Sequence, residues 1–401
     1  MSRYPSPAVG SSGPDLTILM VCDEWLPNRG GISTVNRALA VEFAAQGHQV
    51  ACLVESATTA DQVDAATYGV RLIVAEDTPA GPNLFLPNAE VSRLCPDVVI
   101  GHDRITGEIA WTYARRYGGN PQLVHIVHTA PSLEERYKPT GRATMRIEER
   151  ERFTRLMAKE ADVLAAIGPL LASHTSSVVH DGVAEVAVLR LDPGLDCSGR
   201  TRMPPARPLV LALGRTESIP VKGLDIAAGA VADLAASPGA SAPTLLVRGA
   251  PAVSCDRLHA ELTSATGLAA NQLDVRPFAT GDGEAHRDLM RAAVCVLPSR
   301  AEGFGMSALE AIAVGTPVLV SARSGLAELL FEVLGAGAQP LVVDVSDDSE
   351  RDRAVWSAAL RRVFADLPGA FIHAEGVRRR LAPVLTWETT ARTLLAELAP
   401  R

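Results

Sequence analysis

Positive charge is scarce in this chain, and lysine is its scarcest source. Lys and Arg together number 38 against 46 Asp and Glu, which gives a net charge of −8. Only Lys138, Lys159 and Lys222 are lysines. A protein that binds nucleic acid nonspecifically carries a basic stripe, so this balance of charge argues against a nucleic-acid partner. With so few lysines, each one that is present becomes informative.

Long apolar runs and paired cysteines are also missing. No run approaches the ~20 apolar residues that a membrane span needs, and residues 1–14 lack the apolar stretch of a signal peptide. Because these residues are rich in Pro, Ser and Gly, we expect a disordered tail and no integral membrane association. The six cysteines form no C-x-x-C pair. Most lie in apolar, strand-like runs, so we expect buried, reduced thiols, a cytoplasmic protein and no zinc site.

Three familiar cofactor motifs are absent. The turn Gly30-Gly31-Ile32-Ser33-Thr34 precedes a helical pattern, yet no Gly-Lys-Ser/Thr follows it, so it is not a P-loop. The turn is not a G-x-G-x-x-G fingerprint either, which argues against a dehydrogenase. No Asp-x-Asp pair suggests a bound metal, and we predict neither a metal nor a cofactor.

What the chain does contain is a regular alternation of apolar runs and helical patterns. Its 401 residues, 47% of them hydrophobic, suffice for two domains. The alternation predicts parallel α/β architecture, and the Pro/Gly-rich segment 192–208 reads as an interdomain break. We therefore predict a tail (1–14), a first Rossmann-like domain (15–195), a linker (196–208), a second domain (209–384) and a closing helical segment (385–401).

The expected strands are short apolar runs. In the first half we expect them at Leu16–Cys22, Gln49–Val54, Val70–Ala75, Asp97–His102, Leu123–His128, Val163–Gly168 and Val186–Leu191. In the second half we expect them at Leu209–Gly214, Thr244–Arg248, Leu273–Phe278, Val294–Pro298, Pro317–Ser321 and Leu341–Val345. Ligands of doubly wound sheets bind outside the carboxyl ends of the strands, so the loops that follow these runs are where we look for a site.

The most informative loop is Ser299–Ala311, with two glutamates around a Gly-Phe-Gly turn. A strand, a glycine turn and a helix start offer free backbone N–H groups to a phosphate. If the steps from Glu302 to Glu310 were all helical, the two residues would lie roughly 12 Å apart. That spacing suits carboxylates that accept hydroxyl protons at the two ends of a nucleotide-sugar.

The motif EGFGMSALEA, with its E-x7-E spacing, resembles the donor site of the retaining GT-B glycosyltransferases of family GT4. The resemblance implies two Rossmann-like domains that face a central cleft, with a C-terminal helix that crosses back to the first domain. It also implies that Glu302 binds the hydroxyls of the sugar and Glu310 those of the ribose. The remaining donor contacts that it implies in this loop are Phe304, Gly305, Met306 and Ser307.

Further segments match the same family at the expected order along the chain. Gly30 and Gly31 resemble its GG-x-[ST] turn, which approaches the pyrophosphate of the donor. Arg215 and Lys222, in Gly-Arg…Lys-Gly, resemble the pair that clamps the diphosphate; fixed cations stabilise the charge that develops as a nucleoside diphosphate leaves. Phe278 falls in the loop that receives the base.

Histidines at strand ends complete the implied site. His128 matches the strand-end histidine that approaches the transferred sugar. His102 and Asp103 end another strand and are candidates for the acceptor side. We interpret His125, inside a strand, as a satisfied core residue.

The resemblance implies a retaining, metal-independent transfer of a hexose-type sugar from a UDP- or GDP-type donor to a hydroxyl of an acceptor. Because the sequence carries no membrane signature, we expect that acceptor to be a small molecule. His128, Arg215, Lys222 and Glu302 are the implied catalytic residues. Two alternatives remain open. One is a disaccharide-phosphate synthase, whose sugar-phosphate acceptor would need a basic pocket in the first domain, with Arg104, Arg142 and Arg146 as candidates. The other is a non-enzymatic nucleotide-sugar-binding module. The sequence leaves the oligomeric state unknown.

Overall fold

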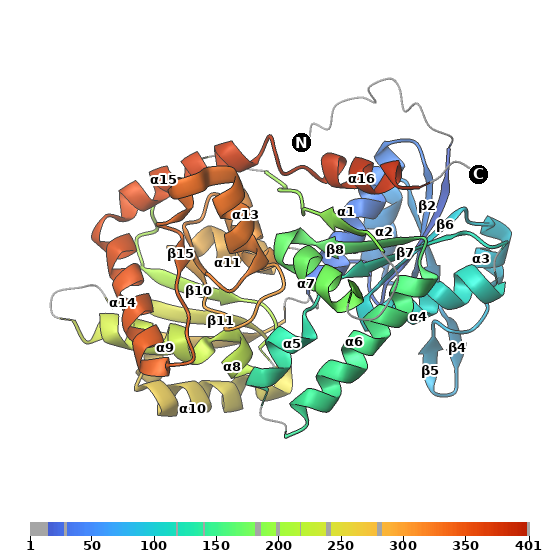
Figure 1. Cartoon of the computed structure of the whole chain (residues 1–401). Helices are drawn as coiled ribbons and strands as arrows, with labels where there is room; N and C mark the ends of the chain where they lie inside the picture. Colours follow the sequence, from blue (N-terminus) through green and yellow to red (C-terminus); the bar gives the residue numbers. More distant parts are fainter. Residues whose placement is uncertain are drawn as a thin grey trace.

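The chain folds into two α/β lobes, each built around one parallel sheet (Figure 1). The computed structural model describes residues 15–27, 30–117, 119–138, 141–180, 186–197, 201–216, 218–237, 242–278 and 283–398. The predicted disordered tail, residues 1–14, and part of the predicted linker, residues 198–200, lie outside the described residues.

The first lobe contains a sheet with the order β3-β2-β1-β6-β7-β8-β9. Its neighbouring strands pair in parallel throughout. The strands are β1 (Thr17–Val21), β2 (Gln49–Val54), β3 (Val70–Val74), β6 (Val98–His102), β7 (Gln122–Val127), β8 (Val163–Ile167) and β9 (Val188–Leu191). Strands covered on both faces read as continuous apolar runs, which is why the sequence revealed them.

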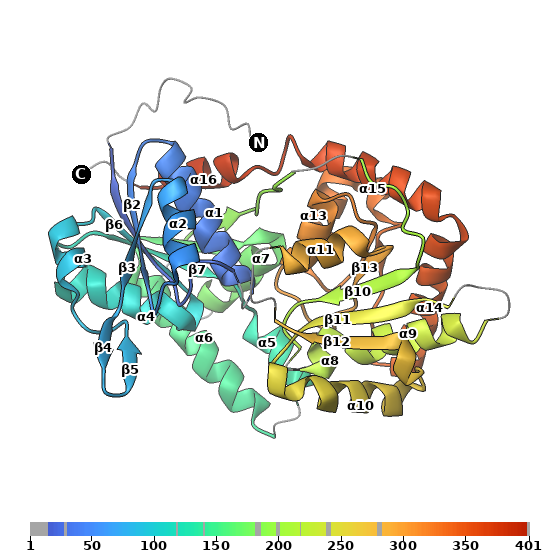
Figure 2. The same ribbon diagram turned by 180° about the vertical axis from the view of Figure 1, so that it is seen from behind.

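Helices cover both faces of this sheet (Figures 1 and 2). They are α1 (Gly31–Ala45), α2 (Thr59–Thr67), α3 (Ala89–Leu94), α4 (Asp103–Thr112) with the π-helical turn η1 (Tyr113–Tyr117), α5 (Pro131–Glu134) with the 3₁₀ turn η2 (Glu135–Tyr137), α6 (Ala143–Glu160) and α7 (Gly168–His180). A small antiparallel hairpin, β4 (Glu76–Thr78) and β5 (Gly81–Asn83), was not expected from the sequence.

The second lobe repeats the design with the order β12-β11-β10-β13-β14-β15. Its parallel strands are β10 (Leu209–Leu213), β11 (Thr244–Ala250), β12 (Leu273–Pro277), β13 (Val294–Leu297), β14 (Val318–Ser321) and β15 (Val342–Val343). Its helices are α8 (Ile219–Lys222), α9 (Leu224–Ala235), α10 (Cys255–Thr266), α11 (Glu284–Arg291), α12 (Met306–Ala313), α13 (Gly325–Leu334), α14 (Ser349–Ala365) and α15 (Leu367–Leu381). Short 3₁₀ turns occur at η3 (Ala252–Ser254), η4 (Ala270–Gln272) and η5 (Gly335–Ala338).

The last helix, α16 (Trp387–Ala396), crosses back and packs on α1 and β9 of the first lobe (Figures 1 and 2). Ala391 and Leu394 are fully buried there, so the apolar stripe of this helix completes the core of the first lobe. The predicted GT-B architecture, with two Rossmann-like domains and a returning C-terminal helix, is confirmed. The exact domain boundaries stay a prediction.

Two chain crossings connect the lobes, and they touch one another. Leu195 donates its backbone N–H to the carbonyl of Leu385 at 3.0 Å. A Cβ on Gly194 would lie 2.2 Å from the backbone nitrogen of Trp387. Because a side chain there would collide with backbone, the glycine lets the outgoing and returning segments run in contact.

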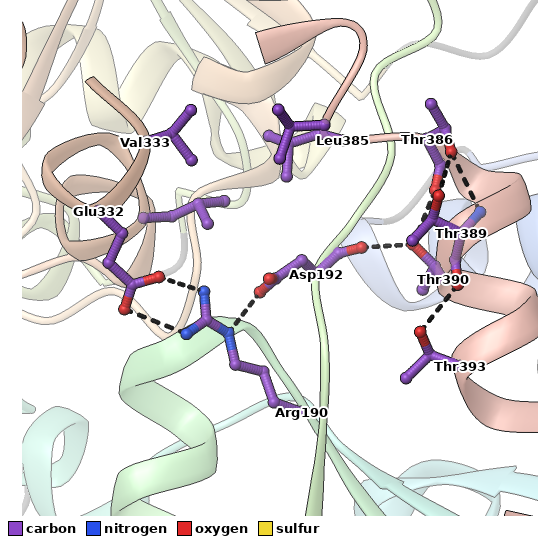
Figure 3. A pocket seen from close by; sticks show the side chains of 11 residues that line it. Arg190, Asp192, Glu332, Val333, Leu385, Thr386, Thr389, Thr390 and Thr393 are labelled. Carbon is purple, nitrogen blue, oxygen red and sulfur yellow. Dashed lines mark hydrogen bonds and ion pairs between the residues drawn. The ribbon is translucent and has the colours of Figure 1, made fainter. Parts of the chain in front are cut away.

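A side-chain clasp flanks these crossings (Figure 3). The guanidinium of Arg190, on β9, contacts the Glu332 carboxylate of α13 and lies 2.8 Å from an oxygen of Asp192. The hydroxyl of Thr390, on α16, donates to the carbonyl of Asp192. These residues border a cavity of about 230 Å³ at the junction of the lobes.

The cysteines correct one expectation. All six are free, but only Cys22, Cys52 and Cys295 are buried, whereas Cys95 and Cys197 are exposed and Cys255 is intermediate. Cys95 and Cys197 lie outside the strands, at the end of α3 and after β9, where no sheet covers them. Among the helices of the described residues, none is long and apolar enough to cross a membrane.

Candidate active site

The strand-end loops of both lobes meet between the two sheets. Gly30 and Gly31 follow β1 and begin α1, as predicted. His102 and His128 stand at the ends of β6 and β7, and Arg215 follows β10. The EGFGMSALEA turn follows β13 and leads into α12, which begins at Met306. This is the edge where doubly wound sheets bind ligands.

Lys222 and Glu302 form an ion pair within the second lobe. The Lys222 Nζ lies 2.8 Å from Glu302 Oε2, and Ser299 Oγ donates to the same oxygen at 2.9 Å. The side chains are 29% and 14% exposed, so the pair is accessible to a ligand yet partly shielded from water. A charge-assisted contact of this kind fixes the carboxylate in one orientation.

A second ion pair, with a buried guanidinium, holds this arrangement in place. The Arg300 guanidinium grips both oxygens of Asp225 at 2.9 and 2.7 Å, and it also donates to the carbonyl of Pro220. The Arg300 N–H donates to the carbonyl of Val221 at 2.9 Å. The strand-end loop and the Lys222 helix are therefore tied together, which places the lysine opposite the first glutamate of the motif.

The glycine turn of the first lobe lies against the donor-motif residues of the second. A Cβ on Gly30 would be 3.5 Å from Arg215 Nε, and one on Gly31 would be 3.0 Å from Met306 Cγ. Gly30 has a φ of +153°, a conformation that glycine adopts readily. The structure thus brings together Gly30, Gly31, Arg215 and Met306, which lie far apart in the sequence.

The turn of the EGFG motif also meets the first lobe. A Cβ on Gly303 would lie 2.8 Å from the backbone oxygen of His128, and one on Gly168 would lie 2.4 Å from the ring of Phe304. Gly168 has a φ of +77°. The carbonyl of His128 is therefore adjacent to the residue that follows Glu302, so any group held by Glu302 lies close to the end of β7.

His128 belongs to a chain of hydrogen bonds that runs into the first lobe. Its Nε2 lies 2.9 Å from Nδ1 of His102, whose Nε2 lies 3.0 Å from Oδ1 of Asn36. Asn36 Nδ2 donates to Cys52 Sγ at 3.4 Å. Burial lowers the pKa of His102 to about 3 and holds that of His128 well below its usual range, so both rings are neutral at pH 7.

Asp103 secures the backbone at this strand end. Its Oδ2 accepts the His128 N–H at 3.1 Å, and its own φ is +41°, an uncommon conformation for a residue with a side chain. Burial raises its pKa to about 7, against the lowering effect of the hydrogen bond from His128. His102 is fully buried and Asp103 is 8% exposed, so a role of either side chain toward an acceptor would be indirect in this conformation.

The remaining predicted residues lie in the second lobe, on and before α12 and after β12. Glu310 lies on α12, and burial raises the pKa of its carboxyl to about 7. Met306, Ser307 and Phe278 are half-buried, while Phe304 is 4% exposed. The Phe278 N–H donates to the carbonyl of Ala250 at 3.1 Å, which holds the loop after β12 against β11.

A cationic cavity of about 340 Å³ lies in the first lobe. The residues lining it are Arg104, Glu135, Lys138, Arg146, Glu149 and Arg150. The Arg150 guanidinium contacts Glu135 at 2.9 Å and donates to Thr129 Oγ1 at 2.9 Å. Thr129 directly follows His128, so Arg150 links the lining of this cavity to the end of β7. Arg104 and Arg146 line it as expected of a basic pocket, whereas Arg142 does not.

Some site residues could not be found from motifs. Arg300 and Asp225 are not part of the matched motifs, but they flank them. Their opposite charges, beside Glu302 and Lys222 in the sequence, were a signal from which an ion pair could have been predicted. Asn36 had none, because its contact with His102 joins residues 66 positions apart. His125 is a core residue as interpreted, but it is not satisfied: its ring nitrogens have no hydrogen-bond partner among the described residues.

Comparisons with known proteins identify the family. A family model described as "Family 4 Glycosyltransferase in conflict systems" matches residues 19–394. A glycogen synthase of Mycobacterium tuberculosis is 26% identical over 417 residues, covering 94% of this chain and 92% of that protein. A D-inositol 3-phosphate glycosyltransferase of Rhodococcus opacus is 27% identical over 402 residues, covering 91% and 84%.

Solved structures share the fold. The sucrose-phosphate synthase of Thermosynechococcus elongatus superposes with a TM-score of 0.69 at 19% identity, covering 94% of this chain and 97% of that one. Anabaena HepE in complex with UDP and glucose gives 0.68 at 14% identity, covering 96% and 99%. Since the family model spans nearly the whole chain, this protein belongs to glycosyltransferase family 4 and is an enzyme that transfers a sugar from a nucleotide-sugar donor.

Proposed function

We propose that the protein is a retaining, metal-independent transferase that moves a hexose-type sugar from a UDP- or GDP-type donor to a hydroxyl of a small-molecule acceptor. The observation that carries the proposal is the approach of Gly303 to the carbonyl of His128, beside the Lys222–Glu302 pair. This arrangement joins a cation for the diphosphate, a carboxylate for the sugar and a backbone oxygen from the other lobe.

In the proposed reaction, the bond between the anomeric carbon and the diphosphate breaks while the bond to the acceptor oxygen forms on the same face. The acceptor's proton passes to the departing phosphate oxygen, so no enzyme nucleophile is needed. Arg215 and Lys222 stabilise the charge that grows on the diphosphate. The carbonyl of His128 supports the positive charge that develops on the sugar, and Glu302 holds the sugar's hydroxyls.

Glu310 would bind the ribose of the donor. A carboxyl group accepts hydrogen bonds from hydroxyl groups most strongly when it is ionised, and burial raises the pKa of Glu310 to about 7. Gly30 and Gly31 leave room for the diphosphate to approach the start of α1. All six cysteines are free, which agrees with a reducing compartment and supports our expectation of a cytoplasmic enzyme.

The direct test is thermal stability with UDP, GDP, ADP or dTDP, each with and without EDTA. A nucleotide at 100 times its Kd adds about 2.7 kcal/mol to the free energy of unfolding. We expect one nucleotide to raise Tm selectively, without sensitivity to EDTA, and the increase to vanish in Glu310→Ala. If no nucleotide shifts Tm, the donor site is misassigned; if EDTA abolishes the shift, the reaction is not metal-independent.

A phosphorylated acceptor is a second candidate, favoured by the cationic cavity beside Thr129. Four basic residues and two acidic ones line it, which suits an acceptor with an anionic group. Several curated relatives are named D-inositol 3-phosphate glycosyltransferase. Inorganic phosphate should then compete with the acceptor, and Arg146→Ala should weaken that competition. Activity indifferent to millimolar phosphate would leave the neutral acceptor as the better choice.

A further inference from the structure

A buried polar chain lies behind His128 and decides which of its ring nitrogens carries the proton. The chain runs from Cys52 on β2 through Asn36 on α1 and His102 on β6 to His128 after β7. Asn36, Cys52 and His102 are fully buried. A buried polar side chain that lacks a partner is costly, so each link constrains the next one.

The direction of the chain follows from the donors and acceptors that each group offers. The amide of Asn36 donates through Nδ2 to Cys52, so its Oδ1 faces His102 Nε2 as an acceptor. A neutral imidazole has one N–H and one bare nitrogen. His102 therefore carries its proton on Nε2 and leaves Nδ1 bare.

The same reasoning fixes the tautomer of His128. Its Nε2 lies 2.9 Å from the bare Nδ1 of His102, and two bare nitrogens cannot form a hydrogen bond, so Nε2 of His128 carries the proton. The polar atom of the ring that remains for a ligand is the Nδ1 lone pair. That atom can accept a hydrogen bond from a hydroxyl group but cannot donate one.

The backbone on both sides of this pair is held as well. The His102 N–H donates to Thr106 Oγ1 at 3.0 Å, and that hydroxyl donates to the carbonyl of Val21 at 2.7 Å. The His128 N–H is held by Asp103. The rings can therefore change their contacts only by turning their side chains, and the Asn36 amide opposes such a turn of His102.

We propose that Asn36 and His102 are positioning residues that hold His128 in its Nε2-protonated tautomer, so that its Nδ1 accepts a hydrogen bond from a hydroxyl of the transferred sugar. The choice of a sugar as the ligand rests on the proposed function, since the carbonyl of His128 adjoins Gly303 and hence Glu302. A site that accepts a hydroxyl proton in a shielded position discriminates against donors without that hydroxyl.

The first test reads the tautomers directly. In long-range ¹H–¹⁵N spectra of the full-length protein with labelled histidines, we expect His102 and His128 each to show a protonated Nε2 and a bare Nδ1 at pH 7. His102→Asn and His128→Gln provide the assignments. In Asn36→Leu, His128 should become a mixture of both tautomers. A proton on Nδ1 of His128 in the wild type, with the chain reversed from the Cys52 thiol, would overturn the proposal.

The second test measures turnover, as UDP release from UDP-glucose. We expect Asn36→Leu to lower kcat about tenfold, the scale of one lost hydrogen bond. His102→Leu should lower kcat further, and His102→Asn should restore part of it, because its side-chain oxygen can accept from Nε2 of His128. The matched control is His125→Leu, which replaces a buried histidine on β7 that takes no part in the hydrogen-bond chain. This variant should leave the His128 tautomer and kcat unchanged.

The two tests distinguish a failure of the proposed function from a failure of the positioning role of Asn36 and His102. A wild type with the expected tautomers that releases no UDP would count against UDP-glucose as donor in the proposed function, and the tautomer result would stand. Wild-type turnover that persists unchanged in a folded Asn36→Leu protein would refute the positioning role itself.

Discussion

Replacing Lys222 with alanine removes the cation that lies 2.8 Å from Glu302 at the proposed diphosphate position. A unit charge 4 Å from a phosphate oxygen is worth about 4 kcal/mol at an effective dielectric constant of 20. The lysine side chain is 29% exposed, so solvent screening reduces this figure. Loss of one preorganised electrostatic contact typically costs 10²–10³ in kcat, and we expect a loss of about 100-fold.

Lys159, one of the three lysines of the chain, offers a matched control. Lys159 is an exposed residue in the last turn of α6 and lies outside the proposed donor motifs. Lys159→Ala should therefore retain full activity. Initial rates of nucleoside diphosphate release would be compared for the wild type and both variants, at saturating donor and at donor below KM. Equal Tm values would show that each variant is folded.

Two results would contradict this reasoning. Turnover by Lys222→Ala within about threefold of the wild type would show that the charge on the leaving group is stabilised elsewhere. A loss confined to KM, with kcat unchanged, would mean that Lys222 binds the donor and its transition state equally well. Only a loss in kcat agrees with a role in the departure of the diphosphate.

Three further predictions concern other parts of the molecule. The raised pKa of Glu310 means that its ionised form is disfavoured in the folded protein. The Tm of the wild type should therefore fall as the pH rises from about 4.5 through 7, and the Tm of Glu310→Gln should fall by less over the same range. Gly303→Ala should reduce kcat, because the added Cβ would prevent the approach to the His128 carbonyl. Gly376→Ala is the control, since a Cβ added there meets nothing within 4 Å, and it should keep the wild-type kcat. Equal kcat values for the two variants would refute this prediction. A double-mutant cycle on Arg190 and Glu332, by thermal unfolding, should give about 0.2–1 kcal/mol, and zero coupling would show that the clasp is not stabilising.

The fold was largely predictable because its strands are buried on both faces. Every strand of the two parallel sheets lies within one residue or two of an expected apolar run, such as β2 at Gln49–Val54. The β4–β5 hairpin was missed because its segments, Glu76–Thr78 and Gly81–Asn83, are short and polar. They pair locally and bury little apolar surface, so no periodicity marks them.

Residues of the candidate site could be predicted from the sequence only where they belong to short local motifs. Glu302, Lys222 and Gly31 stand in such motifs, and the fold brings their neighbours into contact. The support behind them was not predictable, since Asn36 and His102 are linked only after α1 and β6 have packed together. Glu135 likewise has a local partner in Lys138, three residues on, but gains Arg150 only once α6 packs against the η2 turn.

The return of α16 to the first lobe has a consequence for how the protein is made. Ala391 and Leu394 fill the core of the lobe that is synthesised first, yet they follow the whole second lobe in the sequence. The second lobe, whose sheet and covering helices lie between residues 209 and 381, is complete before that. The part of α1 that α16 covers therefore stays exposed on the nascent first lobe until the second lobe has been synthesised, so the second lobe can complete its fold first.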